Sequence, residues 1–134
     1  MPSLRSRLLL LLCVLALPML GSAAPSQWIY VLRLIPRLHD DQAWTDDDKR
    51  AVGTHFAHLQ EATKRGQVIF AGRTMESSNR TFGLVIFEAE DEAAAHTFMM
   101  SDPAVQRGVM TAELHSFALV LSRTPRPPPA SAQP

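Results

Sequence analysis

The chain has 134 residues, 46 % of them hydrophobic, and it carries 13 basic and 13 acidic side chains. This length favours one small domain, and the balanced charge lacks the surplus of basic residues that marks nucleic-acid-binding proteins. The single cysteine, Cys13, lies in an apolar N-terminal segment, which leaves the rest of the chain without disulfide or thiol chemistry. Such a domain depends for its stability on its hydrophobic core or on a partner subunit.

Residues 1–23 have the three parts of a secretory signal peptide. Arg5 and Arg7 precede an apolar run at 8–17, and small residues follow at 21–24. The run is shorter than the roughly 20 apolar residues that a membrane-spanning helix needs. We therefore expect cleavage after Ala23 and a mature protein that is secreted or periplasmic, without a stable membrane anchor. Loss of the segment leaves two more acidic than basic side chains.

The first half of the mature chain predicts a strand, a loop and a long helix. Residues 27–36 are rich in aromatic and branched side chains and end at a proline, as strands often do. A loop is expected at 37–44. Thr45 then begins a helix whose first turn is acidic, close to a capping box and suited to the positive end of the helix dipole. The helix is expected to reach Lys64 and to stop at Gly66.

The second half predicts two strands, a helix, a short helical turn and a last strand. These elements are expected at 67–71, 80–88, 91–100, 104–106 and 110–121, with a turn at 77–79. The resulting order β-α-β-β-α-β is that of a ferredoxin-like α+β subunit, an antiparallel sheet with helices on one face. The proline-rich end at 123–134 predicts a disordered tail, which leaves one domain at 24–122.

The expected strands are apolar at consecutive positions. Both alternating sets of side chains are apolar in 27–36, in 80–88 and toward the end of 110–121. An antiparallel sheet with helices on one face and water on the other carries polar residues at every second position. The pattern therefore predicts that a second copy of the chain covers the open face of the sheet, in a homodimer.

Short motifs occur in a recognisable order along the domain. The first helix and second strand contain His55-x-x-x-Leu59, Gly66 eleven residues after the histidine, and Ala71-Gly72. The later part contains Glu88-Ala89-Glu90 before an alanine-rich helix, and Ser101-Asp102-Pro103 with Gly108 before the last strand. In order and spacing, over about residues 28–121, the chain resembles the YCII-related family of the dimeric α+β barrel superfamily.

That resemblance implies a ferredoxin-like subunit, a homodimer formed sheet against sheet, and a site that pairs a helix histidine with the aspartate of Asp-Pro. On this chain those residues are His55 and Asp102. The reactions that the resemblance suggests are removal of chloride from a hydroxylated aromatic by a lyase, lactone isomerisation and monooxygenation. Two departures bear on the pocket and its substrate: Arg73 stands where the family often has proline, and Ala104 where an aromatic is frequent.

The residues themselves also single out His55. Helical periodicity places it inside the apolar stripe of the first helix, between the directions of Leu59 and Ala62, with His58 at the edge. A histidine in such a stripe needs a partner, and a carboxylate partner suits it to proton transfer near neutral pH. The alternative is a histidine at the edge of the core that is bonded to a backbone carbonyl.

Asp102 has a structural alternative as well. An aspartate before a proline is typical of a helix N-cap, so capping alone stands beside a shared structural and chemical role. Arg73, His58 and His115 are candidate ligand-binding residues, and Arg73 has the guanidinium group that binds carboxylates.

No metal and no cofactor are expected. The acidic and histidine residues at 39–41 and the aspartates at 46–48 lack the spacing of a dedicated metal site. A glycine-rich phosphate loop and a Ser/His/Asp nucleophile motif are also missing from the sequence.

Three classes of function remain open from the sequence. The first is a small lyase or isomerase in which His55 and Asp102 transfer a proton on a small organic molecule. The second is a homodimer that binds a small ligand without turnover. The third is a structural or interaction protein that docks through its proline-rich tail.

Overall fold

The computed structural model describes residues 25–77 and 79–122, so the predicted signal peptide and the predicted tail lie outside the described residues. The chain order of the elements is β1 (Ser26–Leu34), α1 (Asp46–Lys64), β2 (Val68–Arg73), β3 (Gly83–Ala89), α2 (Glu92–Met100), α3 (Pro103–Gln106) and β4 (Met110–Phe117). Two short 3-10 turns, η1 (Pro36–His39) and η2 (Asp41–Ala43), occupy the segment that the sequence predicted as a loop.

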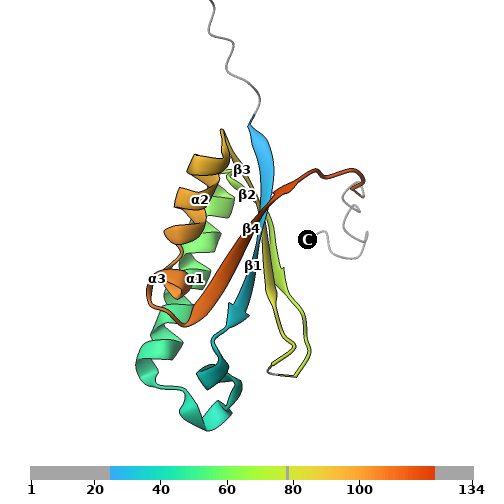
Figure 1. Ribbon diagram of the computed structural model, residues 1–134. Coiled ribbons are helices and arrows are strands. Elements are labelled where there is room, and N and C mark those ends of the chain that lie inside the picture. Colours follow the sequence, from blue (N-terminus) through green and yellow to red (C-terminus); the bar gives the residue numbers. More distant parts are fainter. Residues whose placement is uncertain (1–24, 78, 123–134) are drawn as a thin grey trace, which may run out of the picture.

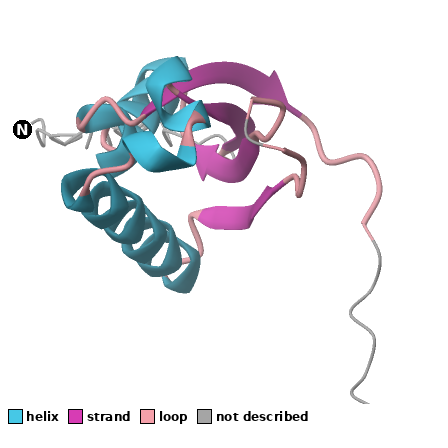
Figure 2. Ribbon diagram, turned by 90° about the horizontal axis from the view of Figure 1, so that it is seen from below, coloured by secondary structure: helices cyan, strands magenta, loops and turns pink. Residues whose placement is uncertain are grey.

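The strands form one antiparallel sheet in the order β2-β3-β1-β4. Figures 1 and 2 show the helices gathered on one face of this sheet, while the other face carries no helix from the described residues. The predicted ferredoxin-like α+β arrangement is therefore confirmed. Within 25–77 and 79–122, no helix is both long and apolar enough to cross a membrane.

The main core lies between the helices and the sheet. Tyr30 of β1 pairs with Val85 of β3 and with Leu114 of β4, so these three side chains share the helix-covered face. The buried residues around them come from α1, α2 and the strands: Leu32, Leu59, Ala62, Val68, Phe87, Ala89, Ala95, Phe98 and Met99. Burial of this apolar surface is the main favourable contribution to folding.

Each helix begins at a side chain that accepts a hydrogen bond from the first turn. Thr45 and Asp48 form the predicted capping box of α1, and Asp91 accepts from the Ala94 N–H at the start of α2. Asp102 caps α3 in the same way. Gly66, with φ of +79°, ends the α1 turn in a left-handed conformation that glycine adopts without a steric penalty.

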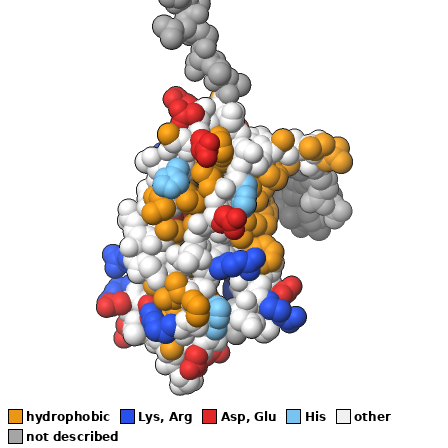
Figure 3. Space-filling view, in the orientation of Figure 1, with side chains coloured by type: hydrophobic (Ala, Val, Ile, Leu, Met, Phe, Trp, Pro, Cys, Tyr) orange, Lys and Arg blue, Asp and Glu red, His pale blue; other side chains and the backbone are white. Residues whose placement is uncertain are grey.

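The last strand is shorter than predicted. It ends at Phe117, which pairs with Gln27, so the expected continuation to Leu121 is wrong. Among the described residues β1 begins at Ser26, one position before that pair, so it gives β4 almost no further partner. Residues 118–122 leave the sheet, and Figures 1 and 3 show them projecting from the body of the protein. Val120 and Leu121 are 84 % and 88 % exposed.

The open face of the sheet is apolar in its middle and polar along one side. The register places Ile29, Val31, Leu84 and Ile86 next to one another on this face. On β4, however, the same face carries Thr111, Glu113 and His115. The expectation that the end of the last strand is apolar on both sides is wrong, because most of the residues on which it depended lie beyond the end of β4. On the surface seen in Figure 3, charged side chains of both signs are scattered and form no continuous basic patch among the described residues.

Candidate functional site

His55 and Asp102 are in direct contact. His55 lies on α1, and Asp102 lies between α2 and α3, 47 positions later in the sequence. The imidazole Nδ1 is 2.8 Å from both Oδ1 and Oδ2 of Asp102. The aspartate side chain is fully buried, and the histidine side chain is 13 % exposed. The structure thus places in contact the two residues that the family resemblance pairs.

The carboxylate of Asp102 has two further donors. The Tyr30 hydroxyl donates to Oδ2 at 2.9 Å, and the backbone N–H of Ala104 donates to Oδ1 at 2.9 Å. Burial raises the pKa of Asp102, but the hydrogen bond and charge of His55, followed by the bonds from Ala104 and Tyr30, bring it below its usual value. Asp102 is therefore an ionised carboxylate at neutral pH and both caps α3 and holds His55.

Tyr30 is the member of this site that the sequence analysis missed. Its side chain is completely buried under the helices, with Phe87 and Phe98 packed edge-on against its ring. Burial, followed by the negative charge of Asp102, raises the pKa of Tyr30 above its ordinary value, so the phenol stays protonated as a donor. One signal was available: a buried tyrosine hydroxyl needs a polar partner, and Tyr30 stands among apolar residues on the first strand.

The arrangement fixes the proton on one side of the imidazole ring. An ionised carboxylate only accepts hydrogen bonds, so His55 must donate to it from Nδ1. In the neutral ring Nε2 then has a free lone pair, and no described residue forms a hydrogen bond with it. The pair can take up a proton at Nε2 and stabilise the resulting imidazolium through Asp102.

His55 lines a cavity of about 630 Å³ between α1 and the sheet. Figure 2 shows the long helix α1 beside the strands that supply the opposite wall. The lining is mostly aliphatic and aromatic, from Leu32, Leu34, Trp44, Val52, Phe56, Leu59, Phe82, Val85 and Met110. Cavities of this size and character are typical of sites for small organic ligands.

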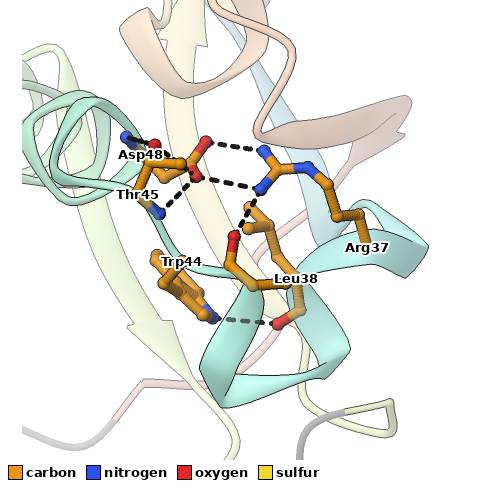
Figure 4. A network of polar contacts seen from close by, with 6 residues as sticks. Arg37, Leu38, Trp44, Thr45 and Asp48 are labelled. Atoms are coloured by element: carbon orange, nitrogen blue, oxygen red, sulfur yellow. Dashed lines mark hydrogen bonds and ion pairs between the residues drawn. The ribbon is translucent and has the colours of Figure 1, made fainter.

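A network at the start of α1 holds one wall of this cavity (Figure 4). The Arg37 guanidinium donates to both oxygens of Asp48, at 3.0 and 2.8 Å, and to the carbonyl of Ala43 at 2.7 Å. Asp48 also accepts from the backbone N–H and hydroxyl of Thr45. Across the two 3-10 turns, the Trp44 indole N–H donates to the Leu38 carbonyl at 3.1 Å. The network thereby sets the position of the Trp44 ring beside the cavity.

The three other candidate residues lie in different places. Arg73, the last residue of β2, lines the cavity. His58 stacks on Phe98 with ring centroids 5.5 Å apart and does not line the cavity. His115 is on the open face of the sheet, with Nε2 3.6 Å from Glu113 Oε1, because β4 turns alternate side chains away from the helices. The structure therefore brings Arg73, but neither His58 nor His115, to the cavity that His55 lines.

Within the described parts of the chain, no three histidine, cysteine, aspartate or glutamate side chains gather in a way that could hold a metal ion. Asp102, the acidic residue next to His55, already has three hydrogen-bond donors. Proton transfer by His55 is the chemistry that this arrangement offers directly.

Among solved structures, the chain is similar to 5-chloro-2-hydroxyhydroquinone dehydrochlorinase from Burkholderia phenoliruptrix AC1100, whose structure is a complex with 2,5-dihydroxybenzoquinone. The two sequences are 16 % identical, the TM-score is 0.47, and the alignment covers 69 % of this chain and 93 % of the other. No curated protein sequence matches the chain.

A family model matches the sequence directly. The model describes the YCII-related domain, and it aligns with residues 31–115, well over half of the chain. The matched range begins within β1 and ends within β4, and it contains both His55 and Asp102. The chain therefore belongs to the YCII-related family.

Proposed function

We propose that the protein is a small acid–base enzyme of the lyase or isomerase type, in which His55 transfers a proton on an organic molecule bound in the cavity. The observation that supports the proposal most is the contact of 2.8 Å between His55 Nδ1 and a fully buried Asp102. A carboxylate that merely capped α3 would not need a histidine from another helix. The pair stands at the wall of a cavity large enough for a small substrate.

In the proposed reaction, Nε2 of His55 removes a proton from a carbon next to a carbonyl group, including the carbonyl in the keto tautomer of a hydroxylated aromatic. The electron pair of the broken C–H bond forms a new double bond. In an elimination the leaving group departs with its own bonding electrons, and in an isomerisation the imidazolium returns the proton to another atom of the substrate. Asp102 stabilises the imidazolium throughout, and the apolar lining excludes water from the reacting atoms.

Solvent exchange offers a direct test of this proposal. Small hydroxylated aromatics and lactones would be incubated with the protein in D₂O, and proton NMR would follow loss of C–H signals and appearance of products. We expect exchange or turnover with wild type and a loss of about 10²–10⁴-fold in His55→Ala. His58→Gln is the matched control, because His58 is on the same helix but outside the cavity lining, and it should retain the activity. Equal rates in wild type and His55→Ala would contradict the proposal.

A second candidate function is ligand binding without turnover. The observation that favours it is that, among the described residues, His55 is the only imidazole or carboxyl side chain that lines the cavity. A substrate would then meet no second acid–base group of these kinds. In that case members of the same panel would raise the melting temperature of wild type, while D₂O incubation would show neither exchange nor product.

We also propose that the protein acts as a homodimer, in which the open faces of two sheets pack together. The support is the run of neighbouring apolar side chains that includes Val31, Leu84 and Ile86. A stable interface of this kind buries roughly 1,200 Å² or more in total. Ile86→Lys should give a monomer in sedimentation, whereas Ala57→Lys, at an exposed position on α1, should leave the dimer intact. A wild type that is monomeric at micromolar concentration would rule this assembly out.

Export from the cytoplasm is the last part of the proposal, and the N-terminal sequence motif supports it. Intact-mass analysis of the protein from its native host should give a chain that starts near Ala24. A soluble cytoplasmic protein that retains Met1 or Pro2 would argue against export.

A further inference from the structure

In the part of the chain that the structure describes, no acidic side chain lines the cavity beside His55. Of the described lining residues, only His55 and Arg73 are ionisable, and both are cationic when protonated. The nearest carboxylate behind the wall, Asp102, is fully buried and is compensated by the bonds from His55, Tyr30 and Ala104. An apolar cavity with a cation and no carboxylate in its described lining favours a negatively charged ligand.

The uncharged polar groups of the lining are already engaged. The hydroxyl of Thr81 donates to the Glu76 carbonyl, and the indole N–H of Trp44 donates to the Leu38 carbonyl. Of the described side chains that line the cavity, Arg73 and protonated His55 therefore hold the N–H donors that remain for a negatively charged ligand. Since His55 is assigned to the reacting carbon, Arg73 is the group that remains for binding and orientation.

Arg73 is placed well for that role. It ends β2 opposite Gly83, on the same side of the sheet as Ala71, whose neighbour Val85 belongs to the core. Within residues 25–77 and 79–122, no carboxylate lies within ion-pair distance of its guanidinium, whereas Arg37 and Arg80 both have acidic partners. A guanidinium presents parallel N–H groups that match the two oxygens of a carboxylate.

From this we infer that the cavity binds small, largely apolar carboxylates, with the carboxylate on Arg73 and the apolar body between α1 and the sheet. The inference rests on the proposed function, because it names the substrate class of the same site. It concerns equilibrium binding, however, so it is measured without any turnover. In this arrangement Arg73, from the sheet, binds the carboxylate of the ligand. His55, from α1, removes a proton from another part of the same molecule.

The test compares matched acids and amides. Dissociation constants of 2-naphthoate and 2-naphthamide would be measured by NMR titration or calorimetry with wild type, Arg73→Gln and Arg73→Lys. We expect wild type to bind the acid about ten- to a hundredfold more tightly than the amide, since a hydrogen bond to a charged group contributes more than a neutral one. Arg73→Gln should abolish the preference, and Arg73→Lys should keep part of it. Added salt should weaken the binding of the acid but not of the amide.

Two controls separate this inference from the proposed function. Arg107→Gln removes an exposed arginine outside the cavity lining and should keep the wild-type preference for the acid. His55→Gln should also prefer the acid, even though it loses turnover. Equal affinity of wild type for acid and amide, a preference that survives in Arg73→Gln, or no binding of the acid at millimolar concentration would each overturn the inference. Each of these results is a binding measurement, so it can overturn the inference while the turnover test of the proposed function still succeeds.

Discussion

Asp48 and Asp102 are the charged residues that the described part of the chain buries, and both cap a helix. Asp48 stands in the first turn of α1 and accepts from Arg37 and Thr45. Asp102 stands before α3 and accepts from His55, Tyr30 and the Ala104 N–H. Each carboxylate thus has at least three donors, and each connects parts of the chain that are not adjacent.

The two aspartates differ in the chemistry of their partners. Arg37 is always protonated, so the Asp48 network has one charge state over the whole physiological range of pH. His55 carries an imidazole ring, which in its neutral form can both donate and accept a proton, and it lines the cavity, whereas Arg37 does not. A buried carboxylate at the start of a helix therefore forms a permanent structural link at α1 and, in the function that we propose, one half of a proton-transfer pair at α3. What distinguishes the two sites is the residue opposite the carboxylate.

The largest effect is expected from Asp102→Asn. Asparagine also caps helices well, so α3 should stay intact. Its amide can donate to His55 Nδ1, however, which would move the ring proton to Nε2 and remove the base. We expect activity to fall by about 10²–10⁴-fold. Nitrogen-15 NMR of the imidazole should show the change of tautomer, and an unchanged tautomer with full activity would mean that Asp102 is only a cap.

The next effect is expected from Tyr30→Phe, which removes a fully buried donor to Asp102. The variant should lose about 1.5–3 kcal/mol of unfolding free energy, because a hydrogen bond to a charged group is lost inside the core. Urea denaturation measures this loss. Phe98→Leu is a useful control, since it changes the packing around Tyr30 without removing a hydrogen bond. Equal stability of Tyr30→Phe and wild type would mean that the hydroxyl contributes nothing.

The next prediction concerns how the stability that Asp48 contributes depends on pH. The hydrogen bonds from Arg37, followed by those from Thr45, hold the pKa of Asp48 well below its usual range. A lowered folded-state pKa gives stability that is complete above the unfolded value of about 3.9 and is lost as the pH falls toward the folded value. Asp48→Asn should therefore be less stable than wild type near neutral pH, and the difference, measured by urea denaturation across the pH range, should shrink in acid. A difference that is independent of pH would exclude this linkage.

The smallest effect is expected from Trp44→Phe. The change keeps an aromatic ring beside the cavity but removes the bond from the indole N–H to the Leu38 carbonyl. We expect a loss of about 0.5–1.5 kcal/mol in unfolding free energy, together with weaker binding of cavity ligands. Calorimetric melting and ligand titration measure the two quantities. Unchanged binding would show that the hydrogen bond from Trp44 to Leu38 does not influence the cavity.

Local signals in the sequence are sufficient for the helices and the order of the strands. The capping box at Thr45 and the glycine at position 66 mark the ends of α1, because caps and left-handed turns depend on residues close in sequence. The end of β4 was not predicted, because residues 119–121 have strong strand propensity and only the start of β1 limits the pairing. The length of β4 therefore depends on where its partner β1 begins and not on the sequence of β4 itself.

In the candidate site, too, local sequence signals predict some residues, whereas contacts between distant residues are not predicted. The apolar stripe of α1 points to His55 and the Asp-Pro sequence points to Asp102, while the family resemblance connects them. Tyr30 was not found, since its hydrogen bond to Asp102 joins residues 72 positions apart and no local pattern announces it. His58 and His115 share a residue type with His55, but helical and strand geometry turn them elsewhere.

The position of β1 in the sheet has a consequence for the time course of folding. Its neighbours are β3 and β4, so Gln27 near its start pairs with Glu88 and with Phe117. Contacts this distant in sequence slow folding, because long loops must close before the contacts form. This inner strand therefore finds its last partner only when almost the whole domain is available. In the export that we propose, β1 can pair with β3 before β4 is available, so one edge of β1 stays open and the sheet stays incomplete until the end of the domain has followed.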